Sequence, residues 1–157
     1  MQDSDIKQNF LNSMRGITST VNVISAAAEG HRHAMTATSV TSLSLDPPSM
    51  LVCVNKDASL HQILLNNSNF CINVLSSLQK EIAEVCSNTE EGESRFVSES
   101  WKHQGPYIYN EDSLSNIFCI KTNQVDHTSH TIFIGTVDRV ITSPDLKPLL
   151  YGSGGYL

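Results

Sequence analysis

The chain has 157 residues, of which 39% are apolar, so it can bury one sizeable core and is too short for two ordinary domains. It carries 16 acidic and 10 basic residues, and the resulting net charge of -6 argues against nucleic acid as a partner. No segment approaches the ~20 apolar residues that span a bilayer, and the N-terminus lacks the pattern of a signal peptide. We therefore expect a single cytoplasmic domain over residues 1–157, with no membrane partner.

The first predicted elements are a helix and a hairpin. An amphipathic helix is predicted over residues 3–15, with Gly16 as its stop. Residues 17–25 and 35–45 are rich in β-branched and small side chains, and they predict two strands that turn at Glu29-Gly30. The apolar face of the helix consists of Ile6, Phe10, Leu11 and Met14.

A strand, a helix and a second strand are predicted next. Asp46-Pro47-Pro48 breaks the chain, because proline cannot donate to a strand ladder. Residues 50–55 are almost all apolar, which is typical of a strand in the core. Asp57 is the expected N-cap of a helix ending near residue 65, and residues 69–75 alternate as a strand should.

The second half predicts one more helix and two long strands. The motif Ser76-Ser77-Leu78-Gln79 fits a capping box that opens a helix. Residues 87–112 are polar and predict an irregular excursion with a short helix near Arg95. Long strands are expected over residues 117–125 and 130–141, so the whole pattern predicts a closed or nearly closed antiparallel barrel with helical insertions. The inner face of the capped helix would be Leu78, Ile82, Val85 and Cys86.

The turn from Asn55 to Ser59 is a candidate phosphate site. No Rossmann or Walker glycine motif occurs in the chain, so any nucleotide must be bound by another device. At this turn the backbone N–H groups of a helix start, the Ser59 hydroxyl and the Lys56 ammonium can converge on one phosphate. The alternative is an ordinary capped helix start with an exposed lysine.

The segment from Thr36 to Ser44 is a second candidate, because it places hydroxyl groups on both faces of a strand. Such a strand offers backbone and hydroxyl hydrogen bonds to a planar heterocycle. The alternative is an edge strand whose hydroxyl groups face water.

Other chemistries have weaker support in the sequence. The pairs His31/His33 and His127/His130 are closely spaced, but no carboxylate or thiol completes a ligand set, so we expect no metal. No Gly-x-Ser-x-Gly motif indicates a hydrolase. The four cysteines are widely spaced without a Cys-x-x-Cys pair, which predicts buried free thiols.

Five sequence blocks stand out when they are taken together. The blocks are HAMTATSVTSLSLDPPSMLVCVNKDASLH (33–61), FCINVLSSLQ (70–79), RF (95–96), HTIFIG (130–135) and LLYGSGGY (149–156). In this order they resemble the flavin reductase-like domain family, which includes the reductase components of two-component flavin-dependent monooxygenases such as 4-hydroxyphenylacetate 3-monooxygenase. The resemblance implies an FMN-binding split β-barrel, mainly β with helices, antiparallel and of Greek-key type, which forms a homodimer with flavin near the subunit interface.

The resemblance also implies roles for individual residues. It implies that four residues contact the isoalloxazine and ribityl chain and that three others hold the flavin phosphate. It also implies that an aromatic residue and a pair of C-terminal tyrosines lie near the flavin. His130 matches the histidine of a Gly-Asp-His block on the nicotinamide side, although Thr128 and Ser129 replace the glycine and the aspartate. The flavin group is Thr36, Ala37, Thr38 and Ser39; the phosphate group is Asn55, Lys56 and Ser59; the aromatic residues are Phe96, Tyr151 and Tyr156.

The implied activity is an NAD(P)H-dependent flavin reductase. NADH or NADPH would donate a hydride from the nicotinamide C4 to N5 of FMN or FAD, a reaction that needs placement of two rings and no protein nucleophile. The reduced flavin would then serve a flavin-dependent oxygenase partner. Two alternatives remain: a flavoredoxin-like electron carrier that retains its flavin, and a barrel that binds a ligand without catalysis.

Overall fold

A curved antiparallel sheet of seven strands dominates the fold. The computed structural model describes residues 2–144 and 147–157, and in this part the chain is mainly β with a few short helices. The prediction of a mainly β, antiparallel protein is therefore confirmed. In order across the sheet, the strands are β3 (His31–Ala37), β2 (Asn22–Ala28), β6 (Asn69–Val74), β9 (Ser115–His127), β10 (His130–Thr142), β5 (Pro48–Asn55) and β4 (Val40–Leu45).

The two edge strands of this sheet are neighbours in the sequence. Only Thr38 and Ser39 separate β3 from β4, so the two edges lie within about 11 Å of each other at that point. The sheet must therefore curl. The prediction of one strand over residues 35–45 is wrong, because the chain bends at Thr38, whose carbonyl oxygen accepts a hydrogen bond from the Val40 N–H at 2.9 Å.

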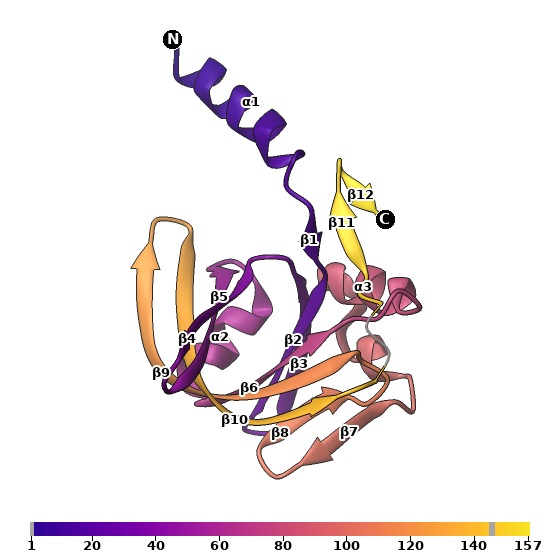
Figure 1. Cartoon of the computed structure of the whole chain (residues 1–157). Coiled ribbons are helices and arrows are strands. Elements are labelled where there is room, and N and C mark those ends of the chain that lie inside the picture. Colours follow the sequence, from indigo (N-terminus) through magenta and orange to yellow (C-terminus); the bar gives the residue numbers. More distant parts are fainter. Residues whose placement is uncertain (1, 145–146) are drawn as a thin grey trace.

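The remaining elements surround this sheet, except for α1, which stands away from it (Figure 1). None of the helices in the described residues is long and apolar enough to cross a membrane. The smaller elements are α1 (Asp3–Met14), β1 (Ser19–Thr20), α2 (Ser59–Asn66), α3 (Lys80–Ser87), the 3₁₀ helix η1 (Thr89–Phe96), β7 (Trp101–Gln104), β8 (Tyr107–Asn110), β11 (Leu150–Gly152) and β12 (Gly155–Tyr156). Strands β1, β11 and β12 form one small sheet, and β7 and β8 form a hairpin.

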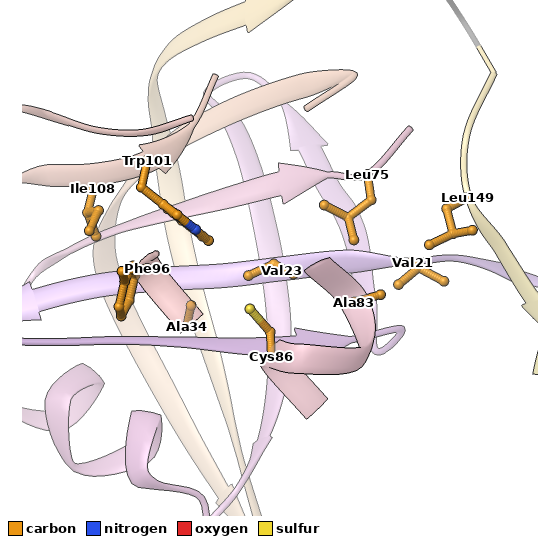
Figure 2. Packing of buried hydrophobic residues seen from close by; sticks show 10 residues of the cluster. All are labelled: Val21, Val23, Ala34, Leu75, Ala83, Cys86, Phe96, Trp101, Ile108 and Leu149. Carbon is orange, nitrogen blue, oxygen red and sulfur yellow. The ribbon is translucent and has the colours of Figure 1, made fainter. Parts of the chain in front are cut away.

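Two large buried clusters and a smaller one around Phe118 hold these elements together. In the first, Leu60 and Leu64 of α2 pack with Phe70 and Phe133 of the sheet. In the second, Ala83 and Cys86 of α3 pack against η1 and the β7–β8 hairpin (Figure 2). All four cysteines are free; Cys71, Cys86 and Cys119 are buried as predicted, whereas Cys53 is half-buried.

Both predicted helix caps are wrong in detail. Helix α2 begins at Ser59, and Asp57 does not cap it; instead the Asn55 side chain accepts a hydrogen bond from the Asp57 N–H at 2.9 Å. Helix α3 begins at Lys80, after the proposed box, although Gln79 Oε1 does accept from the Ser76 N–H at 3.0 Å. Because the helix starts later, Leu78 is 90% exposed rather than on the inner face.

Helix α1 begins at the predicted residue and ends at Met14, one residue before the predicted end, and it has no buried residue. It stands away from the sheet in Figure 1. Its predicted apolar face is exposed, and Phe10 shows 61% of its surface. The face that the periodicity predicts to be buried is therefore not covered by the described residues of this chain.

The Asn73 side chain joins four strands inside the protein. It is fully buried on β6, and its Nδ2 donates to Val23 O at 2.8 Å and to Ser25 Oγ at 2.9 Å, both on β2. Its Oδ1 accepts from the Asn110 N–H of β8 at 2.8 Å and from Asn116 Nδ2 of β9 at 2.9 Å. All four hydrogen-bonding positions of this amide are thus used.

We predict that Asn73→Leu lowers the free energy of unfolding by about 2–4 kcal/mol, because it leaves the buried Asn110 N–H without an acceptor and removes the other hydrogen bonds of the amide. Urea unfolding followed by circular dichroism measures this. Asn12→Leu on the exposed helix α1 is the control and should change the value by less than about 0.5 kcal/mol. Equal stability of both variants would show that the network contributes nothing.

Candidate functional site

A cavity of about 470 Å³ lies between β3, the end of α3 and the C-terminal hairpin. Five of the predicted flavin-contacting residues line it: Thr36, Ala37, Thr38, Tyr151 and Tyr156. The two tyrosines are paired across β11 and β12, with ring centroids 5.5 Å apart in an edge-to-face arrangement. Residues from both ends of the chain thus meet at one wall, and the volume suits a small aromatic ligand.

The hydroxyl-bearing residues at this cavity differ in what they do. Thr36 Oγ1 donates to Ala83 O at 2.7 Å, so this hydroxyl fastens α3 to the edge of the sheet. Thr38 is exposed and also lines two neighbouring cavities of about 430 and 400 Å³. Beyond this bend, β4 is an edge strand with mostly exposed residues. Residues 40–45 therefore form an exposed edge strand, whereas residues 36–38 line the cavity.

Ser39 connects this cavity with the turn from Asn55 to Ser59, the candidate phosphate site, which is called the phosphate turn below. Its carbonyl oxygen accepts from the Cys53 N–H at 3.0 Å, two residues before β5 ends at Asn55. The Ala58 N–H donates to Asn55 O at 3.0 Å, which closes the turn before α2 begins at Ser59. The first N–H groups of α2 lack partners within the helix, so they are available to an anion.

His130 lies at the same end of the sheet as this turn. It pairs with Asn55 across β10 and β5, and the Lys56 N–H donates to Ser129 O at 2.9 Å. Ser129 Oγ is 2.8 Å from His130 Nδ1, so a serine hydroxyl contacts the imidazole where the family block has an aspartate. Thr128 has a left-handed φ of 48°, a conformation that glycine adopts more easily. The tight turn of the Gly-Asp-His block is thus kept without its glycine.

The phosphate turn carries one ammonium group and a nearby carboxylate. Lys56 Nζ is 4.0 Å from Asp126 Oδ1, and both side chains are partly exposed. His61, the third residue of α2, is buried close to this pair. Burial and the charge of Lys56 lower the pKa of His61, and Asp126 partly offsets this, so the imidazole is neutral at neutral pH.

A model of the flavin reductase like domain matches residues 14–157. The chain belongs to this family. It is 37% identical over 154 residues to the reductase component of FADH(2)-dependent resorcinol hydroxylase from Rhizobium sp. (strain MTP-10005), covering 96% of this chain and 86% of the relative. It is 36% identical over 138 residues to flavin reductase (NADPH) from Lentzea aerocolonigenes, covering 84% and 78%. The resemblance predicted from the five blocks is therefore confirmed.

Solved structures share the fold. NADH:FAD oxidoreductase SgcE6 of Streptomyces globisporus superposes with a TM-score of 0.91 at 25% identity, covering 100% of this chain and 95% of that one. Flavin reductase PheA2 superposes with a TM-score of 0.86 at 29% identity, covering 100% and 97%. The flavin reductase fold of the chain thus agrees with its family membership.

Phe96, which is also predicted to pack near the flavin, lies apart from the cavity and from the Asn55–Ser59 turn. It is 7% exposed and packs edge-to-face on Trp101, with ring centroids 5.0 Å apart. The Arg32 guanidinium lies 4.3 Å from the centre of its ring. Phe96 lines none of the cavities described above, so the structure gives it a packing role in the core.

Arg95, which precedes Phe96, is held by backbone carbonyl groups and lies near His33. Arg95 is buried and donates to Asn88 O at 2.6 Å and to Gly92 O at 3.2 Å. Burial and this guanidinium lower the pKa of His33 to about 4, so His33 is neutral. Among the described residues no group of three His, Cys, Asp or Glu side chains could hold a metal ion.

Several cavity residues of this flavin reductase-like chain were not predicted. Val21, Ser87, Gly154 and Gly155 complete the wall of the main cavity. Ser87 is the last residue of α3, and no local sequence pattern indicates that this helix ends at the cavity. The glycines belong to the Gly-Ser-Gly-Gly segment, whose turn chemistry marks the β11–β12 hairpin and could have indicated it.

Proposed function

We propose that the chain is an NAD(P)H:flavin oxidoreductase that transfers a hydride from NADH or NADPH to FMN or FAD and supplies the reduced flavin to a monooxygenase. The observation that carries this proposal is the cavity in which Thr36, Ala37, Thr38, Tyr151 and Tyr156 meet. The names of the relatives support it, because they include an NADPH-dependent flavin reductase and the reductase component of a hydroxylase.

The proposed flavin site runs along the bend between β3 and β4. The isoalloxazine would lie against residues 36–38 and the tyrosine pair, and Ser39 would face the ribityl chain. Asn55, Lys56 and Ser59 would hold the phosphate, where an ammonium group and the N-terminus of α2 lie on one turn. His130, one strand away from Asn55, would lie on the nicotinamide side.

This arrangement is suited to hydride transfer. The flavin accepts the hydride at N5 and supplies the redox chemistry when it is bound. The chain's own groups bind and orient the two ring systems, and backbone donors can stabilise the negative charge that develops on the reduced ring. No described residue needs to act as a nucleophile, which agrees with the lack of any nucleophile-base pair in the sequence.

We predict that the purified protein oxidises NADH or NADPH catalytically when FMN, FAD or riboflavin is in excess. The absorbance of the reduced nicotinamide measures this. Tight retention of flavin without turnover would instead support the flavin-holding carrier. If the protein neither binds flavin nor oxidises the nicotinamide, the reductase and the carrier are both contradicted. The remaining function is then a barrel that binds another ligand.

We predict that His130→Ala lowers kcat/KM for the nicotinamide on the order of tenfold while leaving flavin affinity unchanged. Steady-state kinetics and flavin fluorescence titration measure the two effects separately. His127→Ala is the matched control, because His127 is the exposed cross-strand partner of His130. Equal losses of nicotinamide use and flavin affinity would exclude this role.

The bend between the edge strands supports a Greek-key split β-barrel.

The exposed apolar residues support a homodimer. Helix α1 carries its whole apolar face in solvent, and Leu43 and Leu45 of β4 are also exposed. A second copy that covers these side chains would remove the cost of exposing them. We further propose that residues 1–157 act as one flavin reductase-like domain; its cytoplasmic location stays a prediction.

We predict that the protein sediments with the mass of two chains and that Phe10→Lys shifts it toward one. The substitution places a charge in the apolar face of α1, which a dimer would have to bury. Ser4→Lys, at an exposed polar position of the same helix, is the control. A single-chain mass for the unmodified protein would contradict the homodimer.

A further inference from the structure

Three side chains from three elements form a hydrogen-bonded chain beside the phosphate turn. Thr131 is fully buried on β10, where it pairs with Val54 of β5 and with Asp126 of β9. Thr131 Oγ1 donates to Asp126 Oδ1 at 2.9 Å and lies 2.7 Å from His61 Nε2. Because the single hydroxyl proton goes to the carboxylate, the imidazole must be the donor to Thr131.

These hydrogen bonds hold the exposed carboxylate of Asp126 in a fixed position. Asp126 is 67% exposed at its side chain, whereas His61 is 7% exposed and packs 5.5 Å from the Phe133 ring. An exposed carboxylate normally moves among several rotamers, since water satisfies it in all of them. Here the buried Thr131 hydroxyl, itself held by His61, anchors one of the carboxylate oxygen atoms.

The same oxygen atom faces the ammonium group of the phosphate turn. Lys56 Nζ lies 4.0 Å from Asp126 Oδ1, and no other ion pair of Lys56 occurs among the described residues. A phosphate bound at the turn would carry about two negative charges. It would have to share Lys56 with Asp126, and the carboxylate would also repel it.

We propose that Asp126, held by Thr131 and His61, weakens the binding of flavin phosphate by competing for Lys56. The inference rests on the proposed phosphate site at the Asn55–Ser59 turn. It gives that site an affinity suited to exchange, because a reductase that hands its reduced flavin to another enzyme must release it. Asp126 acts through charge and position, and it takes no part in the hydride transfer.

Replacing Asp126 by asparagine tests the proposal, because the amide oxygen can still accept from Thr131 while the charge is removed. We expect the Kd for FMN at low ionic strength to fall about fivefold and the Kd for riboflavin, which lacks the phosphate, to stay unchanged. High salt should reduce the gain, since both side chains are partly exposed. An unchanged or higher Kd for FMN, or an equal shift for riboflavin, would overturn the proposal.

Asp138→Asn is the matched control, because it makes the same charge change on β10. Asp138 accepts from Tyr107 Oη at 3.0 Å and does not contact Lys56. We expect it to leave both flavin affinities unchanged. A gain in FMN affinity equal to that of Asp126→Asn would indicate a general effect of net charge and would overturn the proposal.

Lys56→Met separates the inference from the proposed site on which it rests. If the phosphate binds at this turn, this variant should raise the Kd for FMN about tenfold and leave that for riboflavin unchanged. The gain from Asp126→Asn should then be smaller in the Lys56→Met background. If Lys56→Met has no effect on FMN, both the site and the inference are wrong. If it weakens FMN but Asp126→Asn does not tighten it, only the inference is wrong.

Discussion

The buried amide of Asn73 is the constraint on which the rest of the structure depends. Apolar side chains in two packed clusters would tolerate small shifts of one strand against another, but the amide requires its four partners at fixed positions. It thereby sets the register of β2, β6, β8 and β9. The edge strand β3 is built on β2, so its place depends on the same amide. Because Thr36 then fastens α3 to β3, the wall of the main cavity is tied to this one buried group.

The proposed site depends equally on a short link. Two residues join the edges of the sheet, and they lie between the cavity with the tyrosine pair and the turn before α2. A longer link would let the edges separate and would divide the site into two unrelated halves. Family membership and the fold of the relatives agree with this proposed arrangement, because a flavin needs one protein surface that contacts both its ring and its phosphate.

Much of the sheet could be predicted from the sequence because periodicity reports local burial. The strands near residues 50–55, 69–75, 117–125 and 130–141 have the alternation or apolar content of buried strands, and all four occur. The bend at Thr38 could not be predicted, since it depends on which distant strands β3 and β4 pair with and not on the local sequence. The β7–β8 hairpin was not predicted, because it lies within a polar segment and each of its strands has only four residues. The site residues in the shared blocks were predicted by resemblance, whereas Asp126, Thr131 and His61 meet only in the folded chain.

The left-handed Thr128 at the tip of β9 and β10 has a consequence for motion. A β-branched residue in this conformation costs roughly 1–2 kcal/mol, and the long ladder below it must supply that energy. The cost is localised at the tip, so opening fluctuations should begin there and amide protons near it should exchange with solvent sooner than those around Asn73. His130 and Lys56 lie at this compliant end, and the tyrosine pair lies at the C-terminal hairpin. Local opening should therefore be easier at the tip of β9 and β10 than around the Asn73 side chain.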